Sequence, residues 1–167
     1  MKSGLAKQLP QGKPDAMSHF TSHMDIALEE ARAAARRGEI PVGAVIIAPN
    51  GKVIARAGNR TRELNDPTAH AEILAIRAAC AALGSERLTD HDLYVTLEPC
   101  PMCAMAISAA RIKRLYFGAS DQKSGGIHQG PRIFSHPQAH HVPEIYDGIR
   151  EDEAQTLLTN FFTALRK

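Results

Sequence analysis

Residues 97–103 read LEPCPMC, which places two cysteines, Cys100 and Cys103, three positions apart. A β-prone run at 92–98 (DLYVTLE) precedes them, and the small residues of 100–110 (CPMCAMAISAA) are typical of a helix that packs closely on a sheet. The cysteines therefore fall in the first turn of a helix, where backbone N–H groups stabilise thiolates and residues i and i+3 share one face. This position favours reactive or metal-binding sulfur over inert packing.

The cysteine pair by itself admits three interpretations. A strand–CPxC–helix order also occurs in thiol–disulfide enzymes, although here it comes late, after two predicted helices and three predicted strands. A structural zinc site normally uses four protein ligands, and the chain has no second cysteine pair, although its eight histidines can supply ligands. The third interpretation is a zinc site with only three protein ligands.

The stretch TAHAE at 68–72 supplies what the third interpretation needs. A lone histidine at such a helix start is more often a cap or a surface residue, but with Cys100 and Cys103 His70 completes a His/Cys/Cys set. Three ligands leave tetrahedral zinc one position for a water, whose pKa then falls to about 7. Glu72 is the candidate for moving the proton of that water. Because positions i and i+2 do not share a helix face, the spacing leaves open whether Glu72 reaches the site.

Length and composition indicate an ordinary globular protein. The chain has 167 residues, 44% of them hydrophobic and 23% charged, and we expect one domain at 18–167 after a disordered tail at 1–17. That tail lacks the apolar core of a signal peptide, no apolar run is long enough to span a membrane, and three cysteines are too few for a disulfide framework. We therefore expect a cytoplasmic protein without a membrane partner.

The net charge of +2 means that any binding to nucleic acid depends on a local basic patch. Runs of charge are more often solvated surface, so a patch is a hypothesis. Its candidate members are Arg60, Arg62, Arg111, Lys113, Arg114 and Arg132.

Periodicity and turn residues predict an alternation of helices and strands. We expect helices at 25–37, 69–83, 100–110 and 151–167, strands at 42–48, 52–57, 92–98 and 114–119, and a further short strand within 142–149. PNG at 49–51 is the expected hairpin turn, and Asp66 or Thr68 is the expected cap of the second helix. The segment 120–141 is expected to be a loop. This order indicates a layered α/β domain.

HAE at 70–72 followed by PCPMC at 99–103 matches the H-x-E…P-C-x-x-C signature of zinc deaminases. The stretches PVGAVII (41–47), GNRT (58–61), DPTAHAE (66–72), LYVTLEPCPMC (93–103), RIKRLYFGASDQKSGG (111–126) and FF…LRK (161–167) extend the match. Over residues 20–167 the chain resembles the bacterial tRNA-specific adenosine deaminases, a family within the cytidine/deoxycytidylate deaminase superfamily.

This resemblance implies a cytidine-deaminase-like α/β fold, with three α/β/α layers and a mixed sheet of about five strands. It also implies a homodimer with one Zn²⁺ per subunit, which converts the wobble adenosine of a tRNA anticodon stem-loop to inosine. By position in the motif, His70, Cys100 and Cys103 would hold zinc, and Glu72 would carry protons during attack at C6 of the adenine.

The resemblance further implies contacts with the substrate. Without it, Asn59 would be a turn residue, Val42 strand core, and Asp121 and Lys123 part of a solvated loop, and Phe161 or Phe162 must dock the last helix. An amide can read a base edge, an aromatic side chain can stack on a base, and arginine can contact phosphate. The implied substrate contacts are Asn59, Pro41, Val42, Asp121, Lys123, Phe162 and Arg166.

Two other functions remain open from the sequence. A free-base deaminase for guanine or cytosine would use the same zinc chemistry on a smaller substrate. A zinc-stabilised RNA-binding module would keep the ligands without turnover. The histidines at 128–141 allow two interpretations, a polar surface loop or a contact of His136 and its neighbours with the RNA backbone.

Overall fold

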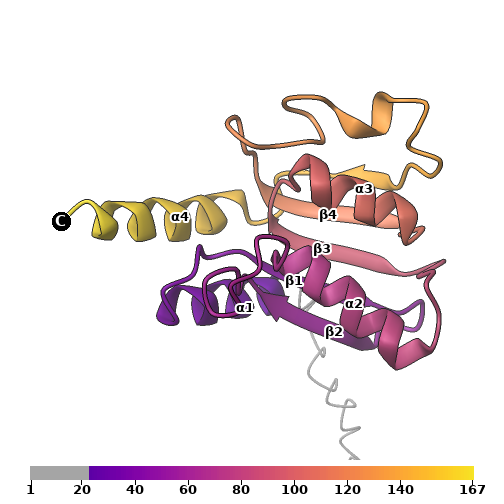
Figure 1. Ribbon diagram of the computed structural model, residues 1–167, viewed down its shortest axis with the longest axis horizontal. Coiled ribbons are helices and arrows are strands. Elements are labelled where there is room, and N and C mark those ends of the chain that lie inside the picture. Colours follow the sequence, from indigo (N-terminus) through magenta and orange to yellow (C-terminus); the bar gives the residue numbers. More distant parts are fainter. Residues whose placement is uncertain (1–22) are drawn as a thin grey trace, which may run out of the picture.

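The computed structural model describes residues 23–167, so the tail expected at 1–17 lies outside the described part of the chain. Every helix and strand expected from the sequence is present within this range, and a short 3₁₀ helix, η1, lies in the loop expected at 120–141. In chain order the elements are α1 (His23–Arg36), β1 (Gly43–Ile47), β2 (Val53–Gly58), α2 (Ala71–Leu83), β3 (Asp92–Leu97), α3 (Pro101–Ala109), β4 (Arg114–Ala119), η1 (Ile133–Ser135), β5 (Glu144–Tyr146) and α4 (Glu151–Leu165) (Figure 1).

The strands form one mixed five-stranded sheet in the order β2-β1-β3-β4-β5. β1 pairs antiparallel with both β2 and β3, whereas β3–β4 and β4–β5 are parallel. Leu97 at the end of β3 is paired with Ala119 at the end of β4, so the segments that follow both strands leave the sheet at the same edge. Ligand sites of open α/β sheets usually lie at this carboxyl edge.

Helices cover both faces of the sheet, which confirms the three-layer α/β/α architecture. On one face, α2 and α3 pack on side chains that include Ile46, Leu93 and Phe117. On the other face, α1 and α4 pack on Val45 and Ile47 of β1. Successive residues of β1 therefore pack into two different hydrophobic cores, because side chains of a strand alternate between the two faces of the sheet. Truncating a buried leucine such as Leu93 to alanine would cost about 2–5 kcal/mol.

Local signals explain where α1 ends and how β1 and β2 are joined. Gly38 has φ +81°, and its N–H donates to Ala35 O (3.0 Å) while the next N–H, of Glu39, reaches back to Ala34 O (3.0 Å). Gly51 has φ +84° in the β1–β2 turn, where Asn50 Oδ1 accepts from Lys52 N–H (3.0 Å). Both glycines occupy left-handed positions that other residues adopt at a cost.

The start of α2 differs from the expectation. The helix begins at Ala71, and His70 is its extended N-cap (φ −71°, ψ 152°), so the expected cap at Asp66 or Thr68 is wrong. Asp66 Oδ1 instead accepts from the N–H (2.8 Å) and hydroxyl (2.7 Å) of Thr68, which closes a turn that precedes the helix. The first helical N–H, of Ala71, donates to Asn59 Oδ1 at the end of β2 (2.8 Å). A distant side chain therefore performs the capping that a local one was expected to perform.

Within residues 23–167, no helix combines the length and the apolar character that crossing a membrane demands.

Candidate metal centre and substrate cavity

The turn from β3 into α3 positions the two cysteines. Cys100 is the extended N-cap of α3 (φ −70°, ψ 169°) and Pro101 takes the first helical position, where its missing N–H costs nothing. Cys103 lies one turn later and is buried. The helix start therefore places both sulfurs on the side that faces the first turn of α2.

His70, the residue before α2, lies next to the two cysteines and completes the group. Its Nδ1 lies 3.6 Å from Cys100 Sγ and 3.5 Å from Cys103 Sγ. Zn–S bonds of about 2.3 Å and Zn–N bonds of about 2.05 Å, set at tetrahedral angles, require S···N separations of about 3.5 Å. The ligand atoms of the three residues lie within 4.8 Å of one another, and no fourth His, Cys, Asp or Glu of residues 23–167 joins them. The geometry fits a three-ligand zinc site, and it does not provide the fourth protein ligand of a structural site.

The electrostatics of the pair suit metal binding. The hydrogen bond from the Cys103 thiol, helped by His70, lowers the pKa of Cys100 to about 4 despite partial burial. The same hydrogen bond, together with burial, raises the pKa of Cys103. Cys100 is thus already a thiolate at neutral pH, which is the form that a metal binds.

Glu72 reaches the same place, which settles the question that its spacing left open. Its side chain is only 3% exposed, and it borders the same cavity as His70 and Cys100. Among the described residues Glu72 Oε2 has no hydrogen-bond partner. Burial raises the pKa of Glu72 to about 7. His70 precedes α2 in an extended conformation, so the helix-face rule does not apply to this pair.

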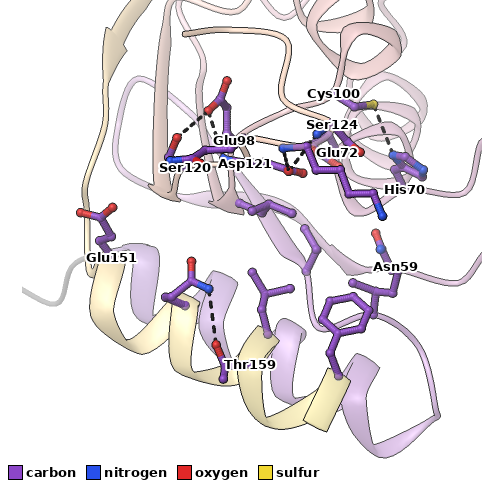
Figure 2. A pocket seen from close by; sticks show the side chains of 18 of the residues that line it. Asn59, His70, Glu72, Glu98, Cys100, Ser120, Asp121, Ser124, Glu151 and Thr159 are labelled. Carbon is purple, nitrogen blue, oxygen red and sulfur yellow. Dashed lines mark hydrogen bonds between the residues drawn. The ribbon is translucent and has the colours of Figure 1, made fainter. Parts of the chain in front are cut away.

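A cavity of about 900 Å³ opens from the metal centre and runs between the carboxyl edge of the sheet and α4 (Figure 2). Of the residues implied as substrate contacts, all but Pro41 line it. Of the candidate zinc ligands, all but Cys103 line it, and Pro41 and Cys103 are both buried. The lining residues that had been expected are Val42, Asn59, His70, Glu72, Cys100, Asp121, Lys123, Phe162 and Arg166.

Asn59 has two roles in the cavity. Its side chain is 7% exposed, and Oδ1 accepts from Ala71 N–H at the start of α2 (2.8 Å). The Nδ2 amide group can still donate two hydrogen bonds to a base. The same residue therefore holds the helix that presents His70 and borders the space beside it.

The loop after β4 brings Asp121 and Lys123 to the cavity wall. Asp121 Oδ1 accepts from the N–H groups of Lys123 (3.1 Å) and Ser124 (2.9 Å), so the carboxylate also shapes its own loop. Figure 2 shows the segment crossing above the cavity, opposite α4.

α4 forms the opposite wall. Ion pairs fix its first turn on α1, since Arg150 pairs with both Asp25 and Glu153, and Arg32 lies 3.5 Å from Glu153. Phe162 is 40% exposed in the cavity wall and meets Phe161 edge-on, with ring centroids 5.5 Å apart.

Several lining residues were not expected from the sequence. On α4 they recur every three or four positions, so the amphipathic pattern could have found that face of the helix. Nothing local in the sequence marked the others, which come from three different segments. The unexpected residues are Ile40, Leu97, Glu98, Ser120, Gln122, Ser124, Glu151, Gln155, Leu158, Thr159 and Thr163.

The six basic residues do not form one patch around the cavity. Arg60 is paired with Glu63 (2.7 Å). Arg114 begins β4, at the opposite edge from the cavity, and lies near Asp92 (3.4 Å) and Glu144 (3.5 Å). A six-residue strand separates the two edges by about 17 Å. The cationic groups that do line the cavity are Lys123, Arg166 and, when protonated, His70.

Three of the four histidines at 128–141 have partners within the chain. His136 Nε2 lies 2.6 Å from Pro131 O, and His141 Nε2 lies 2.6 Å from Ile112 O. His128 lies 3.5 Å from Asp147 and packs near the ring of Phe117. These contacts support the interpretation of a folded surface loop.

Comparisons with known proteins agree with this geometry. A family model described as the cytidine and deoxycytidylate deaminase zinc-binding region matches residues 17–119. A tRNA-specific adenosine deaminase of Agrobacterium fabrum is 58% identical over 150 residues, which cover 90% of this chain and 98% of that protein. A structure solved in a study of A-to-I editing at the wobble position of transfer RNA is 61% identical and has a TM-score of 0.79, covering 81% of this chain and 97% of that one. A guanine deaminase of Bacillus subtilis is 34% identical with a TM-score of 0.60, covering 90% of this chain and 94% of that one.

Proposed function

This chain belongs to the cytidine and deoxycytidylate deaminase family, and we propose that it hydrolyses adenosine to inosine at the wobble position of a tRNA anticodon. The observation that carries the proposal is the cavity, which begins at His70, Glu72 and Cys100 and continues along α4. A relative at 58% identity is a tRNA-specific adenosine deaminase, which supports the same substrate.

We assign the zinc ligands to His70 Nδ1, Cys100 Sγ and Cys103 Sγ, whose spacing fits a tetrahedral ion. Zinc bound there supplies a Lewis acid that lowers the pKa of a coordinated water to about 7. The family's zinc-binding region covers all three residues.

Glu72 is the proton carrier in this proposal. The reaction adds water to C6 of adenine and breaks the bond to the exocyclic nitrogen, which leaves as ammonia. Glu72 accepts a proton from the attacking water and delivers it to the ring nitrogen N1. It then moves the proton of the new C6 hydroxyl group to the departing amine, which leaves C6 as a carbonyl. A carboxyl group with a pKa of about 7 both accepts and donates protons readily at neutral pH.

Groups at the end of the cavity would place the target adenine, turned out of the RNA stack, beside the metal centre. The Asn59 amide can donate to a base edge, and Val42 offers an apolar wall. Pro41 is buried and directly precedes Val42, so its contribution is to fix the backbone that carries Val42.

The shape of the cavity favours a polymer over a free base. Its lining runs from Glu151 to Arg166 on α4, and fifteen helical residues span about 22 Å, much longer than one nucleobase. Phe162 is placed to stack on an unpaired base, and Lys123 and Arg166 are placed to meet phosphates, with Asp121 holding the loop that carries Lys123. A tRNA substrate would place the protein in the cytoplasm.

We also propose that the protein is a homodimer. Met102, Met105, Ala106 and Ala109 form one stripe on α3, with Met102 38% and Met105 39% exposed. A groove beside this stripe is lined by Ile73 and Ile76 of α2, with the charged residues Arg77, Glu86 and Arg87 also in its lining. Exposed apolar surface of this kind is typical of a contact with another protein surface.

Incubation with an anticodon stem-loop, followed by mass analysis of its nucleosides, tests the proposed reaction. We expect one inosine at the wobble position and no product from free guanine or cytosine. Deamination of the free bases alone would instead establish the smaller-substrate function, which the likeness to a guanine deaminase keeps as the rival. RNA binding without turnover by zinc-loaded protein would establish the binding module.

A further inference from the structure

Glu98 lies between the end of β3 and Cys100, and its carboxylate is 2% exposed. Oε1 accepts from the hydroxyl of Ser120 (3.1 Å) and the N–H of Asp121 (3.2 Å). Oε2 accepts from the consecutive N–H groups of residues 127, 128 and 129, at 3.1, 3.0 and 3.1 Å. One side chain therefore binds both ends of a loop that contributes Lys123 to the cavity.

The five donors require a carboxylate. Its two oxygens offer about four lone-pair sites and no hydrogen, so they can accept from donors on every side. An amide at this position would turn its NH₂ group toward N–H donors, and a buried donor left without an acceptor is costly. The loop also comes very close, because a Cβ on Gly125 would lie 2.5 Å from Glu98 Oε2.

The loop at 120–129 also packs closely against the turn that carries Cys100. Gly126 N–H donates to Pro99 O (2.8 Å). A Cβ on Gly126 would lie 2.7 Å from Pro101 N and 2.9 Å from the carbonyl carbon of Cys100, so no side chain fits there. These close contacts fix the distance between the loop and the Cys100 turn, and Glu98 accepts hydrogen bonds from both ends of the loop.

We propose that Glu98 is a positioning residue, which locks the 120–129 loop onto the Cys100 turn and so fixes Lys123 at a set distance from the reacting base. Glu98 acts through the loop, since both of its oxygens are occupied by loop donors. The placement of the loop follows from contacts within the chain. Its effect on substrate rests on the proposed function, in which Lys123 meets the RNA.

Hydrogen exchange measures the loop without RNA. In Glu98→Gln we expect faster amide exchange at 121 and 127–129 with unchanged zinc content. The matched control is Glu39→Gln, because Glu39 is another buried carboxylate (1% exposed) that accepts from the N–H groups of Arg62 (3.3 Å) and Glu63 (2.8 Å). That control should expose only the amides at 62 and 63. Unchanged exchange at 127–129 in Glu98→Gln, or loss of zinc from it, overturns the proposal.

Kinetics measure the consequence for substrate. We expect Glu98→Gln to raise the KM for the anticodon stem-loop roughly tenfold, with kcat changed much less. Lys123→Ala should then cost much less in the Glu98→Gln protein than in the wild type, although the two side chains have no direct contact among the hydrogen bonds and ion pairs of the described residues. In the Glu39→Gln protein the cost of Lys123→Ala should stay at its wild-type value. Additive effects of Glu98→Gln and Lys123→Ala overturn the proposal.

A second variant covers the case in which Glu98→Gln fails to fold. Gly125→Ala keeps the carboxylate but forces the loop away from it, and it should raise the KM and the loop exchange in the same way. Failure of Gly125→Ala to change either quantity overturns the proposal. If wild-type protein makes no inosine at all, the proposed function fails, while the exchange experiment still decides the role of Glu98.

Discussion

Asn59 Oδ1 accepts the first N–H of α2, that of Ala71, over 2.8 Å, and this bond joins the end of β2 to the helix that presents His70. Two substitutions separate this structural role from base reading. Asn59→Asp keeps an acceptor for Ala71 but loses the amide donors, so we expect normal zinc content and a kcat/KM lowered at least tenfold. Asn59→Ala also removes the cap, which should lower the free energy of unfolding by about 1 kcal/mol. Thermal unfolding and zinc analysis of both variants check this, and equal stability would contradict the capping role.

Glu72→Gln should leave a folded, zinc-loaded and inactive protein. The substitution keeps the size of a buried side chain and removes its ability to carry a proton, so kcat should fall by about 10²–10⁴-fold. Inosine formation, measured beside zinc content, tests this expectation. Activity at the wild-type rate would exclude the proton-carrier role, and loss of zinc would make Glu72 part of the metal site.

Zinc binding should weaken as the pH falls. His70 must be neutral and both cysteines must be thiolates when they bind zinc, so protons compete with the metal and a chelator should strip it more readily at pH 5 than at about pH 8. Removal should abolish deamination, and added Zn²⁺ should restore it. Stripping should also make Cys100, whose thiol is partly exposed, reactive toward a thiol reagent. Metal-free protein that cycles between dithiol and disulfide with undiminished activity would support the redox interpretation instead.

Arg166→Gln should reduce the salt dependence of RNA binding. One lost phosphate contact lowers the slope of log K against log salt by about 0.7 for a single strand. Lys52→Gln is the matched control, since Lys52 is exposed in the β1–β2 turn at the opposite edge of the sheet from the cavity. Equal slopes for Arg166→Gln and the wild type would show that Arg166 makes no phosphate contact with the RNA.

Met105→Glu should convert a dimer into monomers. A charge placed in the exposed stripe of α3 would be buried without a partner in the proposed contact, while it remains solvated in the monomer. Sedimentation velocity distinguishes the two states. Lys52→Glu serves as a control for the added negative charge, and a wild-type protein that sediments as a monomer would refute the dimer.

Local periodicity predicted the helices and strands, and a specific motif predicted the candidate zinc ligands. The mixed sheet was predicted only by the resemblance to a known family. The sequence did not predict how His70 and Glu72 meet, since this depends on where α2 begins, and a side chain twelve residues upstream determines that start. Nor did it single out Glu98, whose partners lie 22 to 31 residues further along the chain. The candidate basic patch is a related case, because sequence alone does not show which edge of the sheet each arginine occupies, and none of its six members lines the cavity.

β3 and β4 end at the same edge of the sheet, and the cavity at that edge has two kinds of wall. The proposed chemistry lies at the starts of α2 and α3, whereas α4 borders the cavity with six side chains and is followed by a seventh, that of Arg166. Neither the candidate zinc ligands nor Glu72 lie on α4. If α4 contacts RNA as proposed, then selection, natural or in the laboratory, can change which nucleic-acid sequences are bound by varying this helix alone, while the metal centre is inherited intact.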